Sequence, residues 1–380
     1  MKLLHVKANY ADIQEDITHG HYMRTTFILN LFTHILDGLG LSPSLVKVRI
    51  CRPWGLTSIK TQENIMPLRI KKKEILKLAL ARFGIIQKSI PQVNVKNLKP
   101  ILYDRKMLIV VDDFSTLSML GYEGIDMLVE SGSPIVYLSH NHYNLPKKLK
   151  NLESYLMDNC SFSIVASDRD YLLYKTSYNL PTNKMVVYPN IYPLFLPPSK
   201  EDNINLATEK ESIQTIVLNM GSKVKDDVCG SLIRTVNMAS EMVKGLKIMI
   251  IGDRLATLAR NYSWNVNVEY IPHITDRFRF ILKMSTGHIG VNFSYKGVGT
   301  NIKKFDYALA GLVVLSNTQG CKGELIPYEY TFFDEADFYV KLTDLLRSDL
   351  LNFGHENRRC VLSRAQRSYQ ELYKTMTSIV

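Results

Sequence analysis

A glycine-rich turn that leads into a helix is the part of the sequence best suited to bind an anion. Gly297 and Gly299 follow a short apolar run and let the backbone pass close to a ligand. Thr300 and Asn301 are favoured at a helix N-cap, and they predict a short helix over residues 302–310. Free N–H groups and the helix dipole point to the same place at such a helix start, so the stretch predicts an anion-binding site.

The wider stretch, residues 288–324, resembles a known motif. Its matching residues are Gly297, Gly299, Thr300, Asn301, Lys303, Asp306, Ala308, Gly311, Val313 and Val314. Their order and spacing are similar to the donor-binding motif of retaining glycosyltransferases of the GT-B fold, in the group known as family 4. The chain departs from that motif twice. Asp306 stands where the family has a glutamate, and Val298 stands where many members carry a second carboxylate.

The resemblance implies a role for each matching residue. The backbone N–H groups of Gly299, Thr300 and Asn301, together with Lys303, would bind the diphosphate of a nucleotide sugar. Asp306 would bind the ribose hydroxyls. The family needs neither a metal ion nor another cofactor, so the resemblance implies a UDP- or GDP-sugar as donor substrate and no metal site.

Two further turns in the second half of the chain match the same family. Gly221 opens a loop in which family members carry the pattern G-R-x-x-x-x-K-G. Ser222 replaces the arginine, and either Lys225 or Lys223 would take the role of the lysine. Gly252 matches the first glycine of a G-x-G turn that follows an apolar run. The resemblance implies that these turns lie beside the donor diphosphate.

His140 follows directly on a short apolar run, 135–138, and this placement favours a functional role. Ligands of open α/β sheets bind outside the carboxyl ends of the strands. The run resembles the strand-then-histidine element of the family, in which the histidine approaches the donor sugar, and His142 is the alternative match. A neutral histidine bonded to a backbone carbonyl is the structural alternative. Asp112 and Asp113 end another apolar run, and with no third ligand nearby we favour loop capping over a metal site.

Gly20 and Arg24 are the candidate acceptor-binding residues. They lie where a polar loop, 9–21, gives way to a helical pattern over 22–39. In the family this helix start lines the acceptor side, where Arg24 could meet a phosphate. An arginine that is solvated in the first helical turn is the alternative, and it is the commoner case.

Two series of alternating strands and helices predict an α/β protein with two Rossmann-like domains that face a central cleft. This is the GT-B arrangement that the resemblance implies. We expect an acceptor-binding domain at residues 1–192, a linker at 193–212 and a nucleotide-sugar domain at 213–380. The linker contains a proline pair and acidic residues and few apolar ones. In the family, the last helix crosses back to the first domain.

The composition is that of a globular protein in a reducing compartment. The chain has 380 residues, 46% of them hydrophobic, and a mean hydropathy of −0.06. Its apolar runs fall short of the roughly 18 residues that span a bilayer. The five cysteines are scattered without paired spacing, so neither a disulfide framework nor a zinc site is expected. The first residues turn polar too quickly for a signal peptide. We therefore expect a cytoplasmic protein.

The positive charge is concentrated in one segment. The net charge is +11, and residues 60–106 hold twelve Lys or Arg and three Asp or Glu. Between Lys71 and Arg82, basic and apolar residues interleave with helical spacing. That pattern is typical of a helix on an anionic membrane surface, and solvated lysines on a packed helix explain it equally well. Nucleic acid is not expected as a partner, because Phe83 and Tyr103 are the only aromatic residues of the segment.

The sequence therefore predicts a metal-independent glycosyltransferase that moves a sugar from a nucleotide sugar to a glycan or lipid-linked acceptor with retention of configuration. A peripheral position on the cytoplasmic membrane face would suit a lipid-linked acceptor. A GT-B epimerase, a catalytically inactive GT-B protein and a basic nucleic-acid-binding protein are the alternatives. The inactive protein is among the alternatives because of the departures at Val298 and Ser222.

Overall fold

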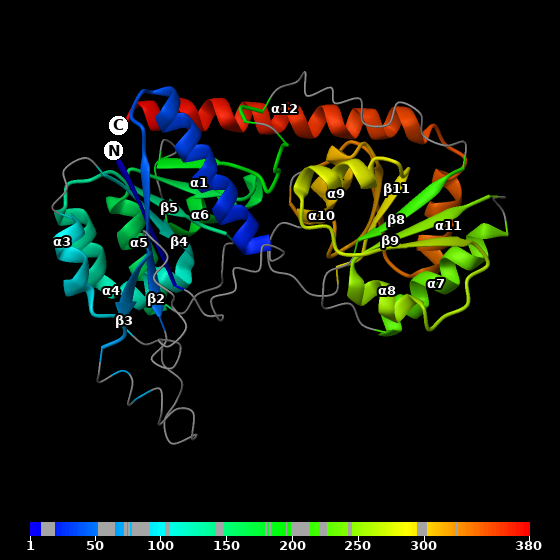
Figure 1. The fold of residues 1–380 in the computed structure, drawn as a ribbon, viewed down its shortest axis with the longest axis horizontal. Helices are drawn as coiled ribbons and strands as arrows, with labels where there is room; N and C mark the ends of the chain where they lie inside the picture. Colours follow the sequence, from blue (N-terminus) through cyan, green and yellow to red (C-terminus); the bar gives the residue numbers. More distant parts are fainter. Residues whose placement is uncertain are drawn as a thin grey trace. The chain divides into compact units, whose positions relative to one another are not determined.

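The computed structural model divides the chain into two compact units (Figure 1). Unit 1 comprises Met1–Tyr188 and Gln370–Val380, and unit 2 comprises Pro189–Tyr369. The structure describes residues 1–8, 20–51, 65–71, 74, 77, 92–102, 107–140, 147–178, 181, 184–194, 196–198, 213–219, 226–241, 245–294, 302–323 and 325–380. The predicted linker falls within unit 2, and most of it lies outside the described residues.

Unit 1 is built on a seven-stranded parallel sheet in the order β3-β2-β1-β4-β5-β6-β7. Its strands are β1 Lys2–Ala8, β2 Ser44–Cys51, β3 Ile65–Arg69, β4 Met107–Asp112, β5 Ile135–Leu138, β6 Phe162–Val165 and β7 Met185–Val187. Its helices are α1 Gly20–Gly38, the short 3-10 helix η1 Val95–Leu98, α3 Lys99–Leu102, α4 Asp113–Glu130, α5 Lys147–Asn159 and α6 Asp168–Tyr178. The central strands are continuous apolar runs, as expected where helices cover both faces of a parallel sheet.

The two faces of this sheet take alternate residues of each strand. Leu4 of β1 and Ile109 of β4 belong to the hydrophobic core that also contains residues of α4, α5 and α6. His5 and Asp112 therefore point to the opposite face, where Thr25 of α1 contacts Asp112. Because β1, β4 and β5 run parallel and in register, their carboxyl ends meet at one edge of the sheet.

Unit 2 contains a six-stranded parallel sheet in the order β10-β9-β8-β11-β12-β13. Its strands are β8 Thr215–Asn219, β9 Lys247–Ile251, β10 Asn267–Ile271, β11 Ile289–Asn292, β12 Val313–Asn317 and β13 Glu329–Phe332. Its helices are α7 Asp226–Ser240, α8 Asp253–Ala259, α9 Arg277–Met284, α10 Ile302–Leu309, α11 Glu335–Leu345 and most of α12 Leu350–Thr377.

Each face of the unit 2 sheet carries its own hydrophobic core. Ile216 and Leu218 of β8 pack with residues of α7, α8 and α11. Val217, between them, packs with residues of α9, α10 and α12 on the other face. Helices α9 and α10 accordingly lie together on one side of the sheet in Figure 1, and α7 and α8 lie together on the other. This layering brings the charged residues of α9 and α10 next to each other.

Two glycines of unit 2 permit close contacts that a side chain would prevent. A Cβ atom on Gly290 would lie 2.2 Å from the ring of Tyr307. A Cβ atom on Gly354 would lie 2.0 Å from the carbonyl oxygen of Gly311. Gly290 thus seats α10 on β11, and Gly354 seats the start of α12 on the turn that follows α10.

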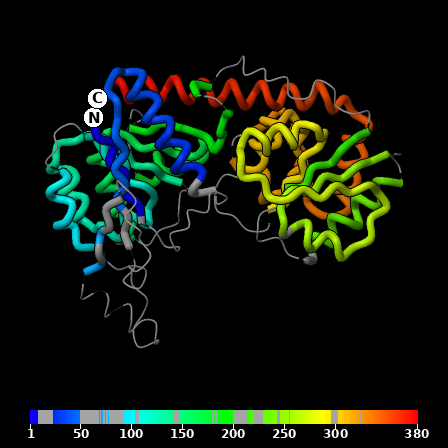
Figure 2. Tube along the Cα trace, in the orientation of Figure 1, coloured from blue at the N-terminus to red at the C-terminus, as the bar shows by residue number. Residues whose placement is uncertain are grey.

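The long helix α12 begins in unit 2, and its residues from Gln370 onward belong to unit 1 (Figure 2). The sequence pattern predicts helices over 335–351 and 355–376. That boundary is wrong, because α11 ends at Leu345 and α12 begins at Leu350. The α/β class is confirmed by both sheets. Among the described helices, none is long and apolar enough to cross a membrane.

Candidate functional site

A buried polar cluster lies at the carboxyl edge of the unit 1 sheet, and we name it the Asp112 cluster. Its members are His5, Lys7, Thr25, Asp112 and His140. The Asp112 carboxylate lies 3.0 Å from His5 Nε2, 2.6 Å from His140 Nε2 and 3.1 Å from Lys7 Nζ, and it accepts a 2.8 Å hydrogen bond from Thr25 Oγ1. Lys7 also donates to Thr25 Oγ1 at 3.0 Å. Four donors, two from β1, one from the end of β5 and one from α1, thus converge on one carboxylate at the end of β4.

The electrostatics of this cluster keep Asp112 ionised. Burial alone would raise the pKa of its carboxyl group, because a charge is costly away from water. Lys7, His140 and the hydrogen bonds from the two histidines outweigh that effect and hold the pKa well below its ordinary value. A carboxylate that is buried, charged and fully engaged by donors is a rigid acceptor, since it has little freedom to rotate.

Asp112 corrects one sequence-based interpretation. It occupies the N-cap position of α4, as loop capping requires, but its side chain makes no capping hydrogen bond. The next residue, Asp113, has a φ of 65°, a left-handed conformation that is uncommon outside glycine. The carboxylate of Asp112 is instead directed to His5 and His140.

The structure places two sequence-predicted residues near this edge. His140 is buried directly after β5, and its Nε2 contacts a carboxylate rather than a backbone carbonyl. Arg24, in the second turn of α1, is only 1% exposed, so the solvated alternative is wrong. Its Nη1 donates to the carbonyl oxygen of Tyr188 at 2.8 Å. Gly20 is the first residue of α1, and His142 lies outside the described residues.

A second group of charges lies in unit 2, between α9 and α10. Asp306 of α10 is buried, and its Oδ1 accepts a 2.5 Å hydrogen bond from Nη2 of Arg277, the first residue of α9. The guanidinium carbon of Arg277 is also 6.0 Å from the ring centroid of Tyr192 and 5.9 Å from that of Phe280. The sequence motif predicted Asp306 and gave no sign of Arg277, which lies 29 residues away in the sequence.

Lys303 lies one turn before Asp306 on the same helix. Burial lowers the pKa of its ammonium group to about 8, and the charge of Asp306 opposes this only in part. The next residue, Lys304, differs in its surroundings. It is fully buried, and its Nζ donates to Glu329 Oε2 at 2.9 Å and to the carbonyl oxygen of Cys321 at 2.8 Å. Lys304 therefore has a structural ion pair, whereas burial is the main influence on the ammonium group of Lys303.

The remaining predicted donor residues are covered only in part. Gly252 lies directly after β9 with a φ of 109°, which requires glycine, and it begins α8 as predicted for a turn at a strand end. Gly221, Lys225, Gly299, Thr300 and Asn301 lie outside the described residues.

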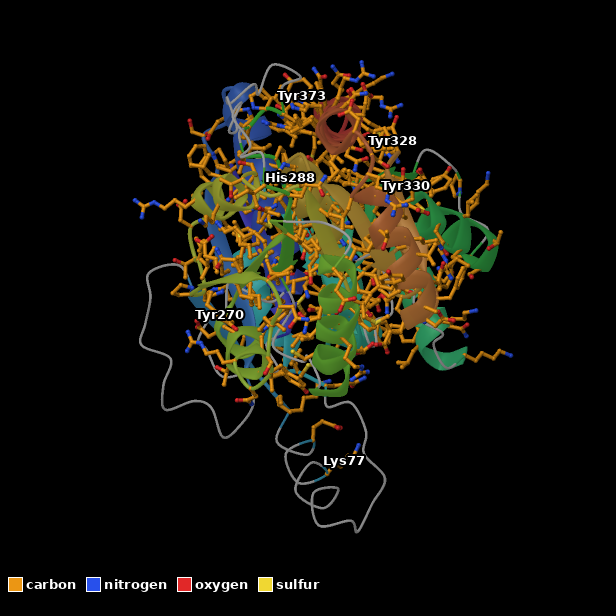
Figure 3. The ribbon with its side chains drawn as sticks, turned by 90° about the vertical axis from the view of Figure 1, so that its right-hand side faces the viewer. Lys77, Tyr270, His288, Tyr328, Tyr330 and Tyr373 are labelled. Atoms are coloured by element: carbon orange, nitrogen blue, oxygen red, sulfur yellow. The ribbon has the colours of Figure 1, made fainter. Side chains whose placement is uncertain are left out.

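Other polar residues of the described part have partners within the protein. No group of three or more His, Cys, Asp or Glu side chains in the described part could hold a metal ion. His288, labelled in Figure 3, lies at the amino end of β11, where its Nδ1 accepts a hydrogen bond from the backbone N–H of Thr215. Of the predicted membrane segment the structure describes Lys71, Glu74 and Lys77. Lys71 pairs with Glu123, and Lys77 pairs with Glu74.

Comparisons with known proteins identify the fold. Neither a model of a protein family nor a curated protein sequence matches the chain. Solved structures do match it over its whole length. An E. coli trehalose-6-phosphate structure with bound UDP-2-fluoro glucose has a TM-score of 0.62 and 12% identity, with 100% of both chains covered. Anabaena HepE in complex with UDP and glucose has a TM-score of 0.58 and 11% identity, also with 100% of both chains covered.

A third match is a glycosyltransferase from Rickettsia africae, with a TM-score of 0.60 and 12% identity over 100% of this chain and 99% of that one. At such low identity these matches establish architecture. They agree with the two parallel sheets of this chain. The chain therefore has the GT-B fold, with two Rossmann-like units, as its strand and helix pattern predicts.

Proposed function

We propose that the protein is a glycosyltransferase that takes its sugar from a nucleotide sugar. The observation that carries the proposal is the charge arrangement on α10, where Lys303, whose ammonium pKa is lowered by burial, lies one turn from the buried carboxylate of Asp306. A diphosphate would compensate the lysine, and a ribose diol would donate to the carboxylate. The solved structures with the same fold support this proposal, because they hold UDP, glucose and UDP-2-fluoro glucose.

The proposed chemistry assigns distinct tasks to the two units. Sugar transfer passes through an oxocarbenium-like state while negative charge develops on the departing diphosphate. Lys303, together with Lys225 and the glycine-rich turn before α10, would stabilise that charge, and electrostatic stabilisation of this kind is usually the largest catalytic contribution. His140 of unit 1 would contact the donor sugar. We propose that no metal ion takes part and that the anomeric configuration is retained.

We propose that the acceptor binds at the start of α1 in unit 1. Arg24 and Gly20 at the start of α1 would lie beside the acceptor, and a glycan or a lipid-linked sugar is the acceptor class. For a lipid-linked acceptor, the basic segment from Lys71 to Arg82 would hold the protein at an anionic membrane surface, on the cytoplasmic side.

A donor-binding experiment tests the proposal. Isothermal titration of the full chain with UDP-, GDP-, ADP- and TDP-sugars, in the presence of EDTA, should show one nucleotide that binds. Asp306→Ala should lose that binding, because the ribose would lose its acceptor. Asp337→Asn, a surface change on α11 that also removes an ion-paired carboxylate, is the matched control and should bind normally. Absence of binding by all four nucleotides would contradict the proposed function.

The stereochemistry needs a separate measurement. Once a donor is found, proton NMR of the first product formed distinguishes axial from equatorial anomeric protons. Retention predicts an α-linked product from an α-linked donor. A β-linked product would contradict retention while leaving the transferase proposal in place.

A further inference from the structure

We infer that Asp112 is a positioning residue for His140: its carboxylate fixes the orientation of the imidazole ring and keeps a proton on Nε2. The inference deepens the proposed function, because it rests on His140 being the histidine that contacts the donor sugar. Asp112, together with Lys7 and His5, would thereby set the orientation and the protonation of His140.

The first step concerns the proton on the ring. An ionised carboxylate accepts hydrogen bonds and cannot donate them. Asp112 Oδ1 lies 2.6 Å from His140 Nε2, so this nitrogen must carry hydrogen, either in the neutral Nε2–H tautomer or in the imidazolium. Oδ2 faces His5 Nε2 at 3.0 Å, the Thr25 hydroxyl at 2.8 Å and Lys7 Nζ at 3.1 Å. The two oxygens thus divide their donors, and Oδ1 faces His140.

The second step concerns charge. Among the described residues, the charged or titratable groups that face the carboxylate are Lys7 and His5 from β1 and His140 from the end of β5. Lys7 already supplies one positive charge to balance one negative charge. Loss of the carboxylate should therefore disfavour imidazolium at His140, and loss of the Lys7 ammonium should favour it. A side chain that only fills space would not produce opposite effects.

The third step concerns the backbone that carries the ring. Ser139 precedes His140 and faces the other side of the sheet, where its Oγ lies 2.7 Å from the hydroxyl of Tyr174. That hydroxyl donates to Glu153 at 3.0 Å, and the hydroxyl of Tyr137 donates to the same carboxylate at 2.7 Å. The end of β5 is therefore held by one buried carboxylate on each face. Glu153 fixes the strand end, and Asp112 fixes the ring.

The strained backbone beside Asp112 agrees with such a role. Asp113 has a φ of 65° directly after Asp112. Non-glycine residues in this conformation are strained and concentrate at functional sites. Here the unusual conformation lies where β4 turns into α4, directly after the residue whose carboxylate contacts His140.

Nitrogen NMR of the histidine rings tests the inference without any substrate. The full chain, labelled with ¹⁵N-histidine, contains nine histidines, and the His140→Gln spectrum identifies the His140 signals by their loss. We expect Nε2 of His140 to carry hydrogen throughout pH 6–9. In Asp112→Asn, the ratio of imidazolium to imidazole at pH 7 should fall about tenfold or more, as for loss of a contacting opposite charge.

Two further variants show whether the change at His140 comes from the charge of Asp112. Lys7→Met should raise the imidazolium share of His140, opposite in sign to Asp112→Asn, and it decides the matter alone if Asp112→Asn does not fold. Asp126→Asn is the matched control, because it removes another unit 1 carboxylate, one that accepts from Tyr155, and it should leave the His140 signals unchanged. The inference is overturned if His140 carries its neutral proton on Nδ1, or if Lys7→Met and Asp112→Asn shift the ratio in the same direction.

The histidine spectrum and the nucleotide-sugar titration distinguish failure of this inference from failure of the proposed function. The ring spectrum needs no donor, whereas nucleotide-sugar titration needs no particular histidine state. Nucleotide binding with an unaltered His140 spectrum in Asp112→Asn would overturn the inference alone. If transfer is detected, Asp112→Asn should lower kcat with the donor KM changed less than about threefold and should shift the pH profile, since a positioning residue does not contact the donor.

Discussion

Two adjacent lysines of α10 give opposite predictions for the same substitution. Burial lowers the pKa of Lys303 from an ordinary 10.5 to about 8, and one pKa unit corresponds to about 1.36 kcal/mol. The folded protein therefore carries a cost of about 3 kcal/mol to keep this ammonium charged at neutral pH. The side chain keeps some contact with solvent, so we expect Lys303→Met to stabilise unit 2 by about 1 to 3 kcal/mol.

The pH dependence separates the charge from simple apolar packing. A lysine whose pKa is lower in the folded state binds a proton more readily when unfolded, so its cost is present below pH 8 and vanishes as the pH rises to 10.5. The advantage of Lys303→Met over the natural protein should therefore be full at pH 7 and much smaller at pH 10. Any gain that packing alone provides would persist at both pH values.

Lys304→Met is the matched control one residue away. It removes the cation that pairs with buried Glu329 at 2.9 Å, and breaking a buried pair costs about 3 to 5 kcal/mol. The same substitution should thus stabilise at position 303 and destabilise at position 304.

Urea unfolding followed by tryptophan fluorescence is the assay. Trp264 packs against one core of unit 2, and replacing Trp54 by Phe leaves it as the sole reporter, because the chain has two tryptophans. The reasoning is refuted if Lys303→Met is no more stable than the natural chain at pH 7, or if its advantage is equal at pH 7 and pH 10. If Lys303→Met is more stable than the natural chain but binds the nucleotide more weakly, the ammonium charge of Lys303 serves ligand binding at a cost in stability.

Three further predictions concern packing and the two acidic residues. Gly290→Ala should destabilise unit 2 by about 3 kcal/mol in the same urea assay, because the new Cβ would lie 2.2 Å from the ring of Tyr307. Asp112 has a lowered pKa, so its stabilising effect should be lost as pH falls below the ordinary value of 3.8, and acid unfolding of Asp112→Asn should be less steep than that of the natural chain. A double-mutant cycle of Arg277→Met and Asp306→Asn, measured by urea unfolding, should give a coupling free energy of about 1 to 3 kcal/mol. The double variant should be more stable than the sum of the two single effects predicts.

The sequence predicts the strands of the central sheets well because their physical signal is local. Strands β4 and β5 are short apolar runs, and both are covered by helices on each face. The same rule predicts a functional role for His140, since ligands of such sheets lie at strand carboxyl ends, and the structure places this residue directly after β5. Strands β3 and β13 gave no comparable signal. β3 contains a proline, Pro67, and β13 is only half-buried at Tyr330 and Thr331.

The sequence does not predict the partners of the site residues, because these contacts depend on the register in which the strands pair. Asp112 meets His5 across 107 residues and His140 across 28. Strand alternation places even-numbered residues of β4 and β5 on one face, but it does not say that odd-numbered residues of β1 join them. Only the pairing of Lys7 with Asp112 in the parallel ladder settles that. The contact of Arg277 with Asp306 is equally hard to predict from the sequence, because the two residues lie on different helices, α9 and α10.

One signal for Asp112 was nonetheless present in the sequence. A charged residue at the end of a continuous apolar strand is bound to be buried or to face a ligand, and buried acids are rare unless they are paired. Lys7 and His5, two residues apart on β1, were the available partners of suitable charge once β1 was placed beside β4. The groups that contact Asp112 lie on β1 and at the end of β5, so proximity along the chain does not reveal them.

The pairing of Asp306 with Arg277 bears on how a shortened carboxylate could serve a ribose. Asp306 is one methylene shorter than the glutamate that the motif leads one to expect, so its reach is smaller. Arg277 Nη2 holds Oδ1 at 2.5 Å, and a second carboxylate oxygen remains on the same group. A ribose diol needs an acceptor that is charged and fixed, and a guanidinium bonded to one oxygen supplies both conditions. Arg277→Lys should therefore weaken nucleotide binding although charge is conserved, because an ammonium lacks the planar fork that orients the carboxylate. Equal nucleotide affinity in Arg277→Lys and the natural chain, measured by titration, would show that Asp306 needs no such orientation.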